Sequence, residues 1–364
     1  MSRTRFFYIL ACLLILTVAI ISRLSFSGSV YGFDYGLYQP DGAHYTFRTL
    51  LFLGHNENEA ARLVVDWYHK YSVDLQSLKT VNLLPETNPL WNLSVPRVIY
   101  PALSMLPVLI FGIPGMLVVP ILSLSILVFV IYQTAFKLGK PNLGLLLIFL
   151  ILASPTVMRW MIANCTDSLL VGLVALYLLV HLSNRSARTV YVWKILLIFL
   201  SSFTRFCLPI WIAIFAAEYF LLKHRKRSLS LVLVSALASL PAILLQPDGN
   251  SAFLPEKNGQ GLLNRLIYLP ISFVKVAFIE IAELAVLDRI LLLLLLFGVF
   301  FALRNLRDEA SLFFLALALA VWTLGALNGV MGVNFRYQLP LLPFLAWLLL
   351  RNLPELTIPK RNWK

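Results

Sequence analysis

The chain has 364 residues, of which 60% are hydrophobic and only 13% are charged. A soluble domain carries about 25% charged residues, so this composition excludes an ordinary soluble protein. The net charge of +13 comes from Lys and Arg clusters between apolar runs, which is typical of a membrane protein and argues against a nucleic-acid partner.

Apolar runs long enough to cross a bilayer recur along the chain, with room for about ten to twelve segments of about 20 residues each. Backbone polar groups in lipid must be satisfied within the segment, and the runs lack the alternation of barrel strands, so they predict helices. We therefore expect an all-α fold, a polytopic transmembrane helix bundle that forms a single integral membrane domain over residues 1–364.

The first predicted element is a transmembrane helix at residues 6–22. Arg3 and Arg5 precede it, and no small-residue cleavage site separates it from a soluble domain, which favours a membrane helix over a signal peptide. The excess of basic residues on the cytoplasmic side of membrane proteins places this N-terminus in the cytoplasm.

A polar stretch at residues 23–97 follows, and we expect it to be a long first extracytoplasmic loop. It holds seven of the seventeen acidic residues of the chain. Within it, residues 56–70 place apolar side chains at helical spacing, which predicts an amphipathic helix along the membrane surface.

Residues 98–351 are expected to form the remaining transmembrane bundle, with a cytoplasmic basic tail at 352–364. The apolar run at 100–110 is short and contains prolines, which predicts a half-helix rather than a full span. The run at 143–161 is interrupted by the pair Ser154-Pro155.

The run at 195–222 holds Arg205 in its middle and has basic flanks at 185–194 and 223–227. Two cytoplasmic flanks predict a hairpin of two short helices with Arg205 at its outer tip. Further spans are expected at 116–136, 168–182, 229–245, 290–303 and 310–327, and in a last segment from Arg336 to Arg351. A polar outer loop at 246–265 and a charged, interfacial or cavity-facing segment at 266–286 lie among them.

Carboxylates at the outer ends of the predicted helices are candidates for catalysis, because a charge near lipid costs several kcal/mol unless it is solvated or paired. Asp41 follows the first helix closely and can act as the general base for an acceptor hydroxyl. Its alternative role is the N-cap of a helix that begins near Gly42. Asp167 opens a span and is the second catalytic candidate, with helix capping as its alternative.

Cations and aromatic residues complete the candidate site. Arg97 can hold a phosphate or anchor the next helix at the interface. Arg205 lies within an apolar run and therefore needs a ligand or a partner, for which Asp167 is available. We expect these residues to converge with Arg336 and Asp41 on one water-accessible cavity. The substrate-binding candidates are His44, Tyr45, Arg97, Tyr100, Arg205, Arg336 and Tyr337.

Metal-ligating residues show no characteristic spacing. The three cysteines lie in or beside apolar segments and form no metal motif and no evident disulfide set. We expect neither a metal site nor a cofactor, and a divalent metal stays an open alternative.

The order of short motifs resembles the GT-C class of membrane glycosyltransferases, which includes protein O-mannosyltransferases and lipid A aminoarabinose transferases. Those families place an essential aspartate in the first extracytoplasmic loop, where Asp41 stands, and resume the membrane with a Pro-containing segment such as Arg97–Pro101. The remaining resemblances are Ser154-Pro155 followed by Arg159 and Asp167, the Thr204-Arg205 pair between two short helices, and the Arg-Tyr with spaced prolines at Arg336–Pro343.

This resemblance implies a GT-C-like fold and an inverting sugar transfer at the extracytoplasmic side of a membrane, which we expect to be the bacterial inner membrane. The partners would be a polyprenyl-phosphate sugar donor, membrane lipids, and a lipid, glycan or protein acceptor. Asp41 would take the acceptor proton, and arginines would stabilise the leaving phosphate.

Two other functions remain as alternatives: a transporter or flippase of lipid-linked or anionic substrates, and an oligosaccharide polymerase. A transporter tends to show internal repeats and charges near the bilayer midplane. This chain instead concentrates its polar residues in one loop and at the outer helix ends, which favours a transferase.

Overall fold

The computed structural model describes residues 3–25, 29–30, 33–34, 36–70, 83–86, 91–221, 225–244, 262–328 and 335–356. These residues are helical apart from connections and one antiparallel ladder between the two-residue strands β1 (Ser29–Val30) and β2 (Phe33–Asp34). The predicted all-α helical bundle is therefore confirmed for the described chain.

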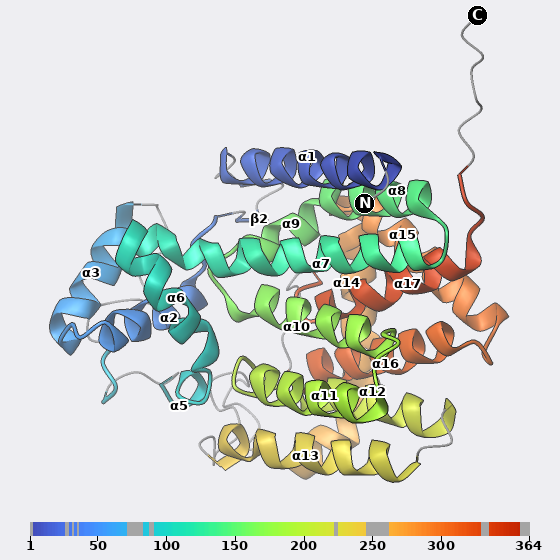
Figure 1. Cartoon of the computed structure of the whole chain (residues 1–364). Helices are drawn as coiled ribbons and strands as arrows, with labels where there is room; N and C mark the ends of the chain where they lie inside the picture. The colour runs from blue at the N-terminus through green and yellow to red at the C-terminus, as the bar shows by residue number, and fades with distance from the viewer. Residues whose placement is uncertain are drawn as a thin grey trace, which may run out of the picture.

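Most of the helices run side by side in one bundle (Figure 1). Its buried centre is α10, which packs against α7, α11 and α17. Gly172 of α10 permits the close contact with α7, because a Cβ there would lie 3.2 Å from the Cβ of Ser123. The bundle consists of α1 (Arg3–Ser25), α7 (Val118–Lys137), α8 (Pro141–Ala153), α9 (Pro155–Met161), α10 (Thr166–His181), α11 (Ala187–Ser202), α12 (Leu208–Leu221), α13 (Arg225–Leu244), α15 (Arg289–Arg304), α16 (Glu309–Asn328) and α17 (Leu342–Asn352).

Several helices have the length and composition of membrane spans. Three described helical segments are long and apolar enough, at Arg5–Ser25, Ile113–Lys137 and Glu309–Ala326. The bent pair α8–α9 would make a fourth, and α6 (Ile99–Phe111), α10, α12 and α17 are shorter apolar helices. These helices are consistent with an integral membrane protein, while the expected ten to twelve segments stay a prediction.

Large apolar side chains remain on the surface of the bundle. Phe220, Phe278 and Leu109 are among many that are more than two-thirds exposed. Exposed apolar side chains in such number agree with the span-like helices.

The expected interruption at Ser154-Pro155 is a sharp bend of 76° between α8 and α9. The Ser154 hydroxyl caps α9 by accepting from the Val157 amide at 3.1 Å. Asp288 accepts hydrogen bonds from the Ser154 hydroxyl and, at 3.0 Å, from the Thr156 amide, so the bend is held by the start of α15.

A second group of helices projects from one end of the bundle (Figure 1). It contains α2 (Pro40–Phe52), the amphipathic α3 (Glu57–Lys70), α5 (Trp91–Ser94) and α6, with the turn η1 (Ile113–Leu117) leading back into α7. A helix is thus found within the predicted stretch 56–70, while its place along a membrane surface stays a prediction. Parts of the 23–97 stretch, including 71–82 and 87–90, lie outside the described residues, as do 246–261 and 357–364.

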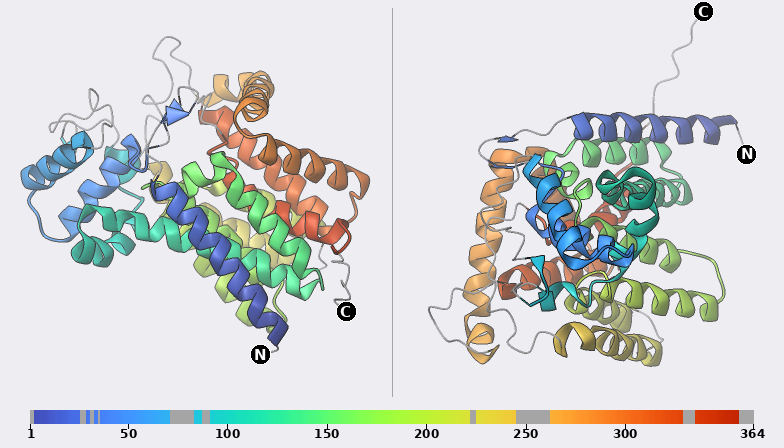
Figure 2. Two further views of the ribbon diagram at one scale, coloured as in Figure 1. Left: turned by 90° about the horizontal axis from the view of Figure 1, so that it is seen from above. Right: turned by 90° about the vertical axis from the view of Figure 1, so that its left-hand side faces the viewer.

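The long helix α14 (Leu262–Leu287) lies across the other helices instead of along them (Figures 1 and 2). It packs on α15 and α16. The start of α1 and the end of α17 lie at the same end of the bundle, away from α2 and α3 (Figure 1). This arrangement agrees with the expectation that both ends of the chain lie on the same side of the membrane. That this side is the cytoplasm stays a prediction.

Candidate functional site

Asp41 lies in the first turn of α2, and its position is set by a close contact with the segment before α10. Helix α2 has Gln39 as its N-cap residue and Pro40 in its first turn, so the alternative role of Asp41 as the N-cap is wrong. The Asn164 side chain accepts from the Gln39 amide at 2.8 Å. A Cβ on Gly42 would lie 2.2 Å from the same Asn164 amide oxygen, so glycine is needed there.

Asp167 lies in the first turn of α10, with Cys165 at the N-cap position, so its capping alternative is also wrong. The carboxylate is only 4% exposed and is held by two cations. Arg205, in the connection between α11 and α12, donates to one oxygen. Arg336 donates to the other through its Nε at 2.9 Å. The predicted partnership of Arg205 with Asp167 is confirmed, and Arg205 lies between two short helices as expected, while its place at the outer side of a membrane stays a prediction.

Arg336 connects the two candidate carboxylates. Its Nη2 lies 2.7 Å from Asp41 Oδ2 and 2.9 Å from Asp167 Oδ2. The guanidinium also lies over the Trp160 ring, 4.8 Å from its centroid. The preceding Phe335 has a φ of 63°, a left-handed conformation that costs a bulky residue about 1–3 kcal/mol. This strained residue therefore lies in the turn that positions Arg336.

Arg97 belongs to the same site through Tyr45 of α2. Its Nη1 donates to the Tyr45 hydroxyl at 2.7 Å. Tyr45 in turn packs edge-on against Tyr100, with 5.6 Å between ring centroids. The buried Tyr100 hydroxyl donates to the Met116 carbonyl at 2.9 Å, so Tyr100 supports the site from behind.

The last two predicted residues lie beside these groups. The Tyr337 ring stacks on the Arg205 guanidinium at 4.6 Å. His44 is buried, and burial lowers the pKa of its imidazole, which favours the neutral form near neutral pH. The structure thus brings all nine predicted site residues together, while their catalytic and binding roles stay predictions.

We call Asp41, Asp167, Arg97, Arg205 and Arg336 the arginine cluster. It contains three guanidinium groups and two carboxylates, which leaves one positive charge in excess. The neighbouring Arg336 guanidinium lowers the pKa of Asp41 to about 2. Asp41 is therefore ionised at neutral pH and, in this arrangement, is a weak base.

Carboxylates paired with arginines are poorly placed to bind a metal ion. Among the described residues no group of three His, Cys, Asp or Glu side chains could hold one. The expectation of no metal and no cofactor itself stays a prediction.

A groove of about 560 Å³ lies between α1 and the α8–α9 bend. Apolar side chains such as Leu14, Val18 and Leu152 line most of it, and Arg23 contributes a positive charge. Arg23 Nε donates to the Met158 carbonyl at 3.2 Å. Met158 lines the groove, and Trp160, two residues later on α9, lies under Arg336, so one short helix connects the groove to the arginine cluster.

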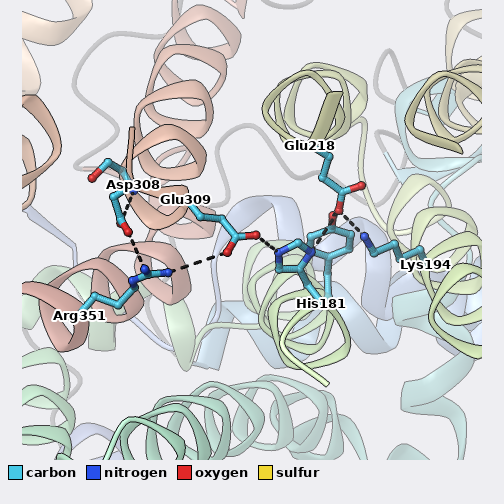
Figure 3. A network of polar contacts seen from close by, with 8 residues as sticks. His181, Lys194, Glu218, Asp308, Glu309 and Arg351 are labelled. Carbon is cyan, nitrogen blue, oxygen red and sulfur yellow. Dashed lines mark hydrogen bonds and ion pairs between the residues drawn. The ribbon is translucent and has the colours of Figure 1, made fainter. Parts of the chain in front are cut away.

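A second polar group, which sequence reasoning missed, lies in the bundle near the start of α16 and the end of α17 (Figure 3). Glu218 of α12 accepts from Lys194 of α11 and lies 3.3 Å from His181 Nδ1. His181 Nε2 lies 2.9 Å from Glu309, and Arg351 lies 2.7 Å from Asp308 and 3.9 Å from Glu309. We call this set the histidine network: His181, Lys194, Glu218, Asp308, Glu309 and Arg351.

One signal could have revealed part of this network. Lys194 was assigned to the basic flank before an apolar run, but α11 begins at Ala187, about two turns earlier. The Lys194 side chain is only 7% exposed. A buried lysine requires an acidic partner, which here is Glu218.

Comparison with known proteins found no similar protein. No family model matches the chain, and neither the curated proteins nor the solved structures contain a match.

Proposed function

We propose that this protein is a membrane glycosyltransferase that moves a sugar from a polyprenyl-phosphate donor to a hydroxyl group of an acceptor. The observation that supports this function best is the arginine cluster, in which a half-exposed carboxylate lies beside an excess of guanidinium groups. A carboxylate can take the proton of the acceptor, and arginines suit the negative charge of a leaving phosphate. We place the reaction at the extracytoplasmic side of the bacterial cell membrane.

The transfer is a single displacement. The acceptor oxygen forms a bond to the anomeric carbon while the bond from that carbon to the phosphate oxygen breaks. The phosphate leaves with the electron pair, and Asp41 receives the acceptor proton. Attack from the face opposite the phosphate inverts the configuration of the sugar.

The other residues of the arginine cluster have supporting roles in this reaction. Arg97, Arg205 and Arg336 would contact the phosphate, with bidentate bonds available from each guanidinium. Asp167 is buried between two of these arginines and fixes their positions, so we assign it a positioning role instead of that of the base.

The groove beside α1 would hold the apolar chain of the donor. Its volume of about 560 Å³ lies within the range of about 300–1,000 Å³ for small-molecule sites. Its lining is apolar, and α9 leads from it to the arginine cluster, so a lipid chain and its phosphate could occupy the two places at once.

One observation favours a second candidate, a transporter or flippase of anionic lipids. Ionisable groups buried in a helical bundle often mark ion or substrate pathways, and the histidine network is such a group. This function would require movement of substrate across the membrane without cleavage of the sugar–phosphate bond.

Purified protein in vesicles with a radiolabelled polyprenyl-phosphate sugar separates the two functions. The transferase predicts release of free polyprenyl phosphate and a labelled acceptor, and both should disappear in Asp41→Asn. Movement of intact donor between leaflets, with no cleavage by the unmodified protein, would refute the transferase and support the flippase.

A further inference from the structure

Arg336 shares one guanidinium between two carboxylates that differ greatly in their surroundings. Its Nη2 is 2.7 Å from Asp41 and 2.9 Å from Asp167, and its Nε also bonds Asp167 at 2.9 Å. A cation that is paired with two carboxylates can lose its contact with the more weakly held carboxylate and still remain paired with the other.

Asp167 is the firmly held partner. Its side chain is 4% exposed, and Arg205 occupies its other oxygen. It also lies in the first turn of α10, where the helix dipole favours a negative charge. Removing a cation from a buried carboxylate of this kind is costly.

Asp41 is the loosely held partner. Its side chain is 46% exposed, and in the described chain its ion pair is with Arg336. Solvent reaches this carboxylate, and one cation holds it where two cations hold Asp167. An incoming anion that contacts Arg336 would therefore displace Asp41 and leave Asp167 in place.

We propose that Arg336 is an exchangeable partner: when a phosphate group binds the arginine cluster, Arg336 moves its contact from Asp41 to the phosphate, and Asp41 becomes free to accept a proton. The positive excess of the cluster attracts such an anion, and a guanidinium binds phosphate in a bidentate manner. This inference takes its phosphate-bearing ligand from the proposed function, but the exchange itself requires no sugar transfer.

The exchange resolves a conflict within the site. Arg336 lowers the pKa of Asp41 to about 2, far below the value that suits a general base near neutral pH. Loss of the Arg336 contact and the arrival of a negative phosphate both raise this pKa. The donor would therefore have to bind before the acceptor hydroxyl could be deprotonated, which sets the order of binding.

Infrared difference spectroscopy of the full-length protein in membranes can measure the exchange directly. The carboxyl band of Asp41 is identified by its absence in Asp41→Asn and is titrated with inorganic phosphate, with a polyprenyl phosphate that carries no sugar, or with chloride at equal ionic strength. We expect either phosphate ligand to raise the pKa of Asp41 by at least about one unit, a tenfold change in proton affinity. Chloride should leave it unchanged.

Arg336→Gln is the matched control, because it removes the exchangeable cation while Arg205 still pairs with Asp167. In this variant the Asp41 band should titrate near the usual aspartate value, with only a small response to phosphate. Identical titrations of the unmodified protein with both phosphates and with chloride would overturn the exchange. None of these ligands carries a sugar, so that result would not bear on whether the protein transfers sugars. Conversely, a failed transfer assay would not contradict a measured exchange of Arg336.

Discussion

The arginine cluster and the histidine network are both groups of charged side chains joined by ion pairs, but they differ in how acidic and basic groups are matched. In the network, Glu218, Asp308 and Glu309 face two permanent cations, Lys194 and Arg351. His181 joins them, with its Nδ1 3.3 Å from Glu218 and its Nε2 2.9 Å from Glu309. Three carboxylates therefore face three basic side chains.

The arginine cluster has three cations for two carboxylates, and one of those carboxylates is half exposed. Near it, Gln338 and Glu280 are fully buried, and the Glu280 carboxyl has the Gln338 side chain and the like-charged Glu283 beside it. A network in which each carboxylate has a basic partner is suited to hold helices together, whereas an excess of guanidinium groups beside a half-exposed carboxylate is suited to bind a ligand. The comparison thus assigns stability to one region and chemistry to the other.

The largest expected effect is on catalysis in the arginine cluster. Asp41→Asn keeps the shape of the side chain but cannot accept a proton, so transfer should fall by about 10²–10⁴-fold while folding and donor binding persist. Rates and donor affinity with the labelled donor measure both quantities. Asp66→Asn, an exposed position on α3, is the control and should transfer normally. Near-normal turnover of Asp41→Asn would make Asp41 a structural residue only.

The opposite outcome is expected in the histidine network. Glu218→Gln leaves Lys194 and His181 without their shared carboxylate, and breaking a buried pair in this way costs about 3–5 kcal/mol. Thermal unfolding in detergent should show a much lower midpoint, while each folded molecule retains its transfer rate. If stability were normal and transfer were lost, the network would take part in function and the comparison would fail.

Arg336→Ala should weaken the donor complex as well as the rate, because a phosphate contact acts in the ground state and in the transition state. Hydrogen bonds to charged groups contribute about 1.5–3 kcal/mol, so donor affinity should fall by about 10–100-fold. Binding of the labelled donor to purified protein measures this loss. Arg351→Ala, which removes the arginine of the histidine network, serves as the control and should bind the donor normally. Equal losses in the two variants would contradict the division of roles.

Sequence reasoning located the arginine cluster because a charge at the edge of an apolar run is conspicuous and costly. The pairing of Arg205 with Asp167 followed from that cost alone. The contact of Asn164 with Gly42 could not be predicted, because it depends on how α2 docks against the segment before α10. The histidine network could not be predicted for a similar reason. The sequence places Lys194 in the basic flank of a helix, and only the start of α11 at Ala187 shows that it lies inside the helix.

The smallest expected effect on sugar transfer concerns Glu280 on α14, whose ionisation should change stability instead. Burial raises the pKa of this carboxyl from 4.5 to about 8, so the folded protein keeps a proton that the unfolded chain releases above about pH 4.5. The free energy of unfolding should therefore fall as pH rises from about 4.5 to about 8 and then level off. Glu280→Gln removes the ionisable group, so the variant should lose this pH dependence and be more stable than the parent above pH 8, by up to about 5 kcal/mol because one pKa unit corresponds to about 1.4 kcal/mol. Unfolding midpoints across this pH range measure the effect, with Glu57→Gln on the exposed surface of α3 as the control. A variant with the same pH profile as the parent would show that the pH dependence comes from another group.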